Sequence, residues 1–175
     1  KKSNPTAQEI LKYKLWLEQK YRSPYTGAII PLSKLFTSAY EIEHIIPKSI
    51  YFDDSFSNKI ICESEVNKAK GNMFGLEYIK NPGLQKVQLS GGNFVTIHTE
   101  EQYRKFIETH YANNKAKAKK LLLEEVPEKM IERQLNDTRY ISKIVKNLLS
   151  KMVRDDNDDD GVTSKNVIST NGTIT

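Results

Sequence analysis

The sequence predicts an α+β fold that is mostly helical, with two short strands and a helix at its centre and a two-stranded antiparallel hairpin after them. Residues 40–44 and 58–62 are short apolar runs separated by a polar loop, and a helical pattern follows the second run. Residues 87–89 and 94–97 flank Ser90-Gly91-Gly92-Asn93, which is a hairpin signal. Elsewhere the apolar residues recur mainly at helical spacing, so helices are expected to surround the strands.

The central segment and the helix before it have recognisable boundaries. Asn4 followed by a proline is typical of a helix start, and an amphipathic helix is expected over residues 5–20. Pro47 ends the first central strand. Ser64 is a good N-cap for the central helix, which places Asn67 in its first turn.

Further helices are predicted in the second half of the chain. Thr99 is expected to cap a helix that reaches His110, and residues 115–125 form a very basic helical segment. Pro127 begins another helical pattern, with a bend expected near Asp137 or Thr138. The apolar stripe of that last segment faces away from its lysines and arginine, which is typical of an amphipathic helix.

Composition limits the classes of function. The 175 residues carry a net charge of +5, and five of the 22 acidic residues lie in the run 155–160. The remainder therefore has 27 basic against 17 acidic residues, which favours a polyanionic partner. No apolar run approaches the ~20 residues of a membrane span. Cys62 is the only cysteine, which excludes an internal disulfide and a thiolate zinc site.

Three polar side chains of the central segment could perform phosphodiester chemistry. Glu43 and the Asn67 carbonyl oxygen are the hard oxygen ligands that Mg²⁺ prefers. His44 could act as a general base, with its second ring nitrogen fixed by an acceptor, for which a loop backbone carbonyl is expected. Taken singly, each residue is more often structural: a buried histidine, a surface carboxylate, or a residue of a helix start. Their combination within the 25 residues 43–67 is what favours a site.

The same segment resembles a known nuclease motif. EHIIP at 43–47, DDSFSNK at 53–59 and SEVN at 64–67 are similar to the HNH, or ββα-metal, motif of RNA-guided type II CRISPR effector nucleases, and the Tyr25-Thr26-Gly27 turn is similar to their compact subtype. The match departs at Glu43, where the family more commonly has aspartate.

The resemblance implies roles for five residues. His44 matches the general base, and Glu43 and Asn67 match the ligands of Mg²⁺, for which Mn²⁺ can substitute. Asn58 matches the asparagine that braces the loop holding the base. Lys70 is a candidate phosphate contact, and the lysines of 115–120 and the basic residues of 139–151 are candidate contacts to the nucleic-acid backbone.

The resemblance also implies the activity and its partners. A domain of this kind would cut the guide-RNA-paired strand of target DNA in the bacterial cytoplasm, with guide RNA and the remaining effector domains as partners, no membrane, and a monomeric isolated domain. Two alternatives stay open: a free-standing homing or restriction-type HNH endonuclease, and a non-cleaving nucleic-acid-binding or gating module.

The resemblance also implies that the chain has three regions. Residues 1–130 are expected to form the HNH domain with flanking helices, and 131–154 a linker helix region. Residues 155–175 are expected to hold the acidic loop and a strand, 167–175, that belongs to a following RNase-H-like domain.

Overall fold

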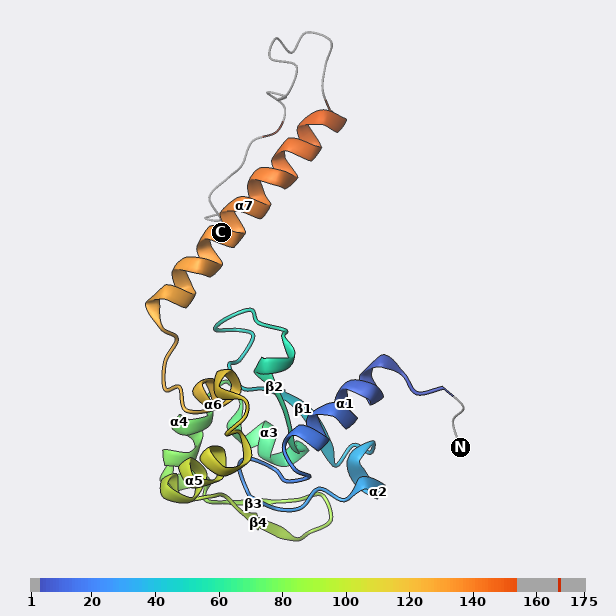
Figure 1. Cartoon of the computed structure of the whole chain (residues 1–175), viewed down its shortest axis with the longest axis vertical. Coiled ribbons are helices and arrows are strands. Elements are labelled where there is room, and N and C mark those ends of the chain that lie inside the picture. The colour runs from blue at the N-terminus through green and yellow to red at the C-terminus, as the bar shows by residue number, and fades with distance from the viewer. Residues whose placement is uncertain (1–3, 154–166, 168–175) are drawn as a thin grey trace. The chain divides into compact units, whose positions relative to one another are not determined.

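The computed structural model describes residues 4–153 and residue 167, and Figure 1 shows its elements. The predicted α+β class is confirmed. Two antiparallel strand pairs, β1–β2 and β3–β4, lie among short helices. In chain order the elements are α1 (Ala7–Glu18), α2 (Leu32–Leu35), β1 (Tyr40–His44), η1 (Phe56–Asn58), β2 (Lys59–Glu63), α3 (Ser64–Lys70), α4 (Gly75–Lys80), η2 (Pro82–Leu84), β3 (Lys86–Gln88), β4 (Phe94–Thr96), α5 (Glu100–His110), α6 (Lys115–Leu121) and α7 (Glu128–Met152).

The chain divides into two compact units, residues 1–126 and residues 127–175. The boundary lies next to Pro127, which caps α7 and so begins the predicted helix where expected. The predicted region boundaries after residues 130 and 154 stay predictions. The acidic run, and all of the predicted strand 167–175 except residue 167, lie outside the described residues.

Several helix boundaries differ from the expectation. Thr6, not Asn4, caps α1, because its side chain and Glu9 form a reciprocal capping box. Glu63, not Ser64, is the N-cap of α3, since the Ser64 hydroxyl donates instead to the Ser38 carbonyl oxygen at 2.5 Å. No bend interrupts α7, which is a continuous helix of 25 residues.

The central strand pair separates two apolar clusters. β1 and β2 pair antiparallel with His44 opposite Lys59 and Glu43 opposite Ile60. One cluster includes Leu15 of α1 and Ile61 of β2. Ile60 belongs to the larger cluster that α4, α5 and the β3–β4 hairpin complete. Because side chains alternate along a strand, β2 contributes to both clusters and all five of its residues are buried.

A buried polar group fixes the strand pair to α1. Gln19 is 1% exposed, and its amide exchanges two hydrogen bonds with the Ile61 backbone, at 2.9 Å from the Ile61 N–H and 2.8 Å to the Ile61 carbonyl oxygen. The described part of the chain contains no helix long and apolar enough to cross a membrane.

Candidate active site

The three residues that the sequence singled out meet in one place. Glu43, His44 and Asn67 line a common open pocket of about 250 Å³, together with Pro47 and Lys48. Glu43 and His44 are the last two residues of β1, and Asn67 lies in the middle of α3. The strand end therefore allows two adjacent side chains to reach the same pocket, although alternation alone places them on opposite faces.

Glu43 is a buried carboxylate with two partners. It is only 3% exposed, its Oε1 lies 2.6 Å from the Lys70 ammonium, and its Oε2 accepts a hydrogen bond from the Tyr25 hydroxyl at 3.1 Å. Burial, followed by the negative charge of Glu43, raises the pKa of Tyr25 well above its usual value, so Tyr25 stays a neutral donor. Lys70 is 1% exposed and its ammonium pairs with Glu43, and its contact to phosphate stays a prediction.

Asn67 is oriented by a second carboxylate of the same strand. Its Nδ2 donates to Glu41 Oε2 at 2.9 Å. Glu41 stands two residues before Glu43, so both carboxylates share the strand face that looks toward α3. Since the amide nitrogen makes this bond, the carbonyl oxygen of Asn67 is the end left for another partner.

His44 is held by a side chain rather than by the expected backbone carbonyl. Its Nε2 lies 2.9 Å from Asp54 Oδ1, so that expectation was wrong. Hydrogen bonds from Lys48, Lys59 and His44 hold the pKa of Asp54 far below its usual range. An ionised carboxylate can only accept, so Nε2 carries the proton and Nδ1 of the neutral ring is the free acceptor.

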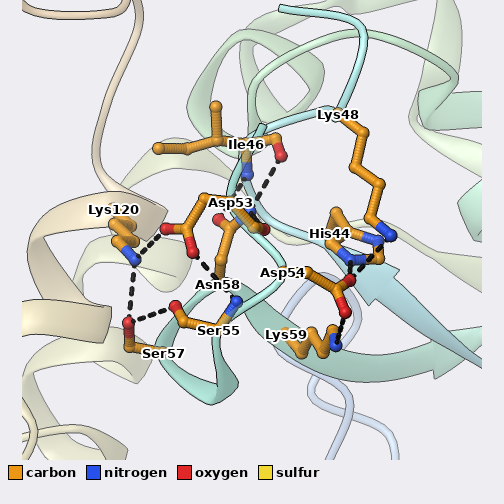
Figure 2. A network of polar contacts seen from close by, with 10 residues as sticks. All are labelled: His44, Ile46, Lys48, Asp53, Asp54, Ser55, Ser57, Asn58, Lys59 and Lys120. Carbon is orange, nitrogen blue, oxygen red and sulfur yellow. Dashed lines mark hydrogen bonds and ion pairs between the residues drawn. The ribbon is translucent and has the colours of Figure 1, made fainter. Parts of the chain in front are cut away.

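Asp54 is surrounded by cationic side chains. Lys48 approaches its Oδ1 at 2.7 Å and Lys59 its Oδ2 at 3.0 Å, as Figure 2 shows. Asp54 itself is half exposed, with 51% of its side chain accessible. The sequence placed Asp54 within the motif but gave no sign that it bonds to His44, which lies ten residues earlier on another element.

Asn58 joins the two ends of the loop between β1 and β2. Its Oδ1 accepts from the Ile46 N–H at 2.9 Å, and its Nδ2 donates to the carbonyl oxygens of Ile46 at 3.0 Å and Asp53 at 2.8 Å. The side chain is fully buried. These bonds satisfy backbone groups that a buried loop would otherwise leave unpaired.

Two lysines of α6 point into the domain. Lys117 is fully buried and pairs with Glu18, and its ammonium also lies 4.4 Å from the centre of the Phe56 ring. Lys120 donates to Asp53 Oδ2 at 2.6 Å and to Ser57 Oγ at 2.8 Å. The sequence named them as candidate contacts to the nucleic-acid backbone, and in this structure both ammonium groups pair with carboxylates of the domain instead. The exposed Lys115 and Lys119 stay candidates.

The pocket offers few oxygen ligands for a metal ion. Within the described ranges, no group of three or more His, Cys, Asp or Glu side chains could hold a metal ion. One carboxylate and one amide oxygen nevertheless fit Mg²⁺, which keeps several waters and is bound by one or two carboxylates plus phosphate. Each Glu43 oxygen has one partner in the structure and can accept a second.

Family comparisons agree with this geometry. Residues 23–76, which include the whole pocket, match the HNH endonuclease family model. Residues 125–175 match the model of RuvC endonuclease subdomain 3. The strand pair, the helix and the shared pocket thus define the chain as one that contains an HNH endonuclease domain.

Comparison with individual proteins shows which HNH endonucleases the chain is similar to. The chain is 31% identical over 157 residues to CRISPR-associated endonuclease Cas9 1 of Streptococcus thermophilus, covering 82% of this chain and 12% of that protein. It is 32% identical over 164 residues to CRISPR-associated endonuclease Cas9 of Staphylococcus aureus, covering 89% and 15%. A crystal structure of Streptococcus thermophilus Cas9 in complex with the GGAA PAM superposes with a TM-score of 0.55 at 30% identity, covering 82% of this chain and 13% of that one.

These matches identify the chain as the HNH region of a type II CRISPR-associated endonuclease of the Cas9 family. The chain spans only about one eighth to one seventh of the length of these curated relatives.

Proposed function

We propose that this chain is the part of an RNA-guided endonuclease that cuts the guide-paired strand of target DNA by attack of water on a phosphodiester. The observation that carries the proposal is the pocket that Glu43 and His44, at the end of β1, share with Asn67 of α3. The residues after 125 that match a RuvC subdomain favour an effector of this kind over a free-standing HNH endonuclease. Target DNA and guide RNA are the proposed partners, and the bacterial cytoplasm is the proposed location.

His44 is the proposed general base. Its Nδ1 is the unprotonated ring nitrogen, because Nε2 donates to Asp54. In this proposal a water molecule in the pocket gives its proton to Nδ1 as its oxygen attacks phosphorus, which is general-base catalysis. Asp54 keeps the ring in this tautomer and stabilises the imidazolium that forms.

Glu43 and the Asn67 carbonyl oxygen are the proposed ligands of one Mg²⁺. When bound, the ion would neutralise negative charge on the phosphate and on the leaving oxygen. Lys70 and Tyr25 hold the Glu43 carboxylate in place, and Glu41 holds the amide of Asn67. The proposal gives Asn58 the role of bracing the loop through its bonds to Ile46 and Asp53.

The base assignment is tested in the full-length endonuclease that contains this chain. His44→Ala should lower the rate of cutting of the guide-paired strand by about 10²–10⁴-fold and leave guide-directed DNA binding unchanged. His110→Ala, a histidine at the far end of α5, is the matched control and should cut normally. Normal cutting by His44→Ala would overturn the assignment.

The ligand assignment is tested separately by NMR of this chain. Titration with Mg²⁺ should shift the Asn67 side-chain amide signals and the backbone signals of Glu43, because both are expected to contact the ion. Glu43→Gln should weaken these shifts, since it removes the only carboxylate among the two ligands. Shifts confined to the exposed loop around Asp54 would place the ion elsewhere.

A further inference from the structure

The loop that carries Asp54 is tied to α6, a helix far away in the sequence. Lys120 lies 67 residues after Asp53, yet its ammonium is 2.6 Å from Asp53 Oδ2 and 2.8 Å from Ser57 Oγ. Both side chains of the ion pair are largely shielded, with 16% of Lys120 and 17% of Asp53 exposed. A shielded pair is screened less by salt and water than a surface pair, so it can hold a fixed geometry.

Asp53 is in turn connected to the rest of the loop. Its Oδ1 accepts from the Ser55 N–H at 2.9 Å, and its backbone carbonyl accepts from Asn58 Nδ2 at 2.8 Å. Ser57 Oγ lies 2.9 Å from Ser55 Oγ, so Lys120 touches the loop on both sides of Asp54 (Figure 2). Burial raises the pKa of Asp53, but hydrogen bonds from Lys120 and Ser55 outweigh it and leave the pKa below the usual value.

The next residue in the chain is the acceptor for His44. With Asp53 fixed, the backbone of Asp54 has little freedom, and its carboxylate remains 2.9 Å from His44 Nε2. Lys48, which is 44% exposed, and Lys59, which is 10% exposed, also bind the Asp54 carboxylate, but neither forms an ion pair with Asp53. Among the described residues, Lys120 is the cation that joins Asp53 to a separate helix.

We propose that Lys120 is a positioning residue for the HNH reaction, which acts through Asp53 and Asp54 to keep the proton of His44 on Nε2 and Nδ1 free to receive a proton. The inference rests on the proposed function of His44 as the base. The ammonium of Lys120 is directed to Asp53 and Ser57 of the loop, so Lys120 acts through the loop. Its effect is on the orientation of the acceptor and hence on the tautomer, and the expected loss on its removal is smaller than the loss of His44 itself.

The tautomer is measured directly in this chain by long-range ¹⁵N–¹H correlation of the His44 ring at mildly alkaline pH. The parent should show the pattern of a ring protonated on Nε2. Lys120→Met keeps the aliphatic stem but removes the ammonium, and should convert that pattern to one averaged between the two tautomers. Lys120→Arg restores a cation and should return the parent pattern. Lys105→Met, an exposed lysine on α5, is the control and should change nothing.

A second variant approaches the same link from the loop. Asp53→Asn removes the charge that Lys120 binds but keeps an oxygen for Ser55, so it should also average the tautomers. The double variant Lys120→Met/Asp53→Asn should change the pattern no more than either single variant, since residues that act through one contact are non-additive. A parent-like pattern in Lys120→Met and in Asp53→Asn would overturn the inference, even if either variant were less stable.

Cutting assays then separate this inference from the proposed function. In the full-length endonuclease, Lys120→Met should lower the rate of guide-paired strand cutting by about tenfold with DNA binding unchanged, a fraction of what general-base catalysis supplies. An altered tautomer with normal cutting by both Lys120→Met and His44→Ala would mean that the link exists but His44 is not the base. An unaltered tautomer with no cutting by His44→Ala would keep the base and exclude the role of Lys120.

Discussion

At the scale of single residues, the pocket depends on a buried ion pair that the sequence did not reveal. Glu43 and Lys70 are 3% and 1% exposed, with their charged atoms 2.6 Å apart. The residues are on different elements, and their pairing requires α3 to pack on the face of β1 that carries Glu43. Sequence reasoning could nominate both for a site but had no means of pairing them.

This pair predicts that Glu43 variants lose stability as well as activity. Glu43→Gln leaves the buried Lys70 ammonium without a counter-charge, and breaking such a pair costs about 3–5 kcal/mol of unfolding free energy. The double variant Glu43→Gln/Lys70→Met removes both charges and should recover much of that loss. Urea unfolding of the single and double variants measures the coupling.

An exposed ion pair in the same compact unit serves as the control for the stability loss. Lys80 and Glu124 are 39% and 53% exposed and lie 2.6 Å apart, so Lys80→Met should cost at most about 1 kcal/mol. Equal losses for Glu43→Gln and Lys80→Met would show that the Glu43–Lys70 pair is not buried as described.

At the scale of elements, periodicity and turn signals predicted most of what forms. The two central strands, α3, the β3–β4 hairpin and the helix after Thr99 all stand close to where the sequence placed them. These elements depend on local patterns, namely alternation, Gly-rich turns and caps, which a sequence displays directly. The predicted caps Asn4 and Ser64 were wrong by two residues and one residue, because side-chain contacts decide the boundary: Thr6 forms a capping box with Glu9, and the Ser64 hydroxyl donates to the Ser38 carbonyl oxygen.

The basic helix α6 shows the limit of this kind of prediction. The sequence predicts that its lysines face solvent or nucleic acid, because charge alone does not determine the direction of a side chain. Lys117 and Lys120 instead enter the domain to meet Glu18 and Asp53, which lie 99 and 67 residues away. Partners at such separations depend on tertiary packing, so only the structure could supply the link between α6 and the loop of His44.

At the scale of the whole domain, two histidines outside the site make folding sensitive to pH. Burial lowers the pKa of His98, whose ring is tilted against the Phe106 ring with the ring centres 5.6 Å apart. Burial also lowers the pKa of His110, which stacks on the same Phe106 ring at 3.8 Å between ring centres. His98 also lies against Gly27, whose φ of +68° and closeness to the imidazole leave no room for a side chain. Protonation of either ring would place a charge in this packed region.

The sign of the effect follows from the direction of the shifts. A folded pKa below the unfolded value of about 6.5 means that the unfolded chain binds protons first as pH falls. The stability that the neutral rings provide is therefore fully present above about pH 6.5 and is lost as pH falls through the lower folded values. Urea unfolding one pH unit above and one below that value should give a smaller free energy on the acid side. Aspartate and glutamate, with reference values near 4, contribute little to this difference.

The double variant His98→Gln/His110→Gln isolates the contribution of these two rings. It retains His44, so any pH dependence that His44 contributes is common to parent and variant. The double variant should be less stable than the parent at the higher pH, because it loses the ring packing against Phe106, but its free energy of unfolding should change less between the two pH values. An unchanged pH dependence in the double variant would mean that the two rings titrate alike in the folded and unfolded chain, and that their burial does not govern the acid sensitivity of this domain.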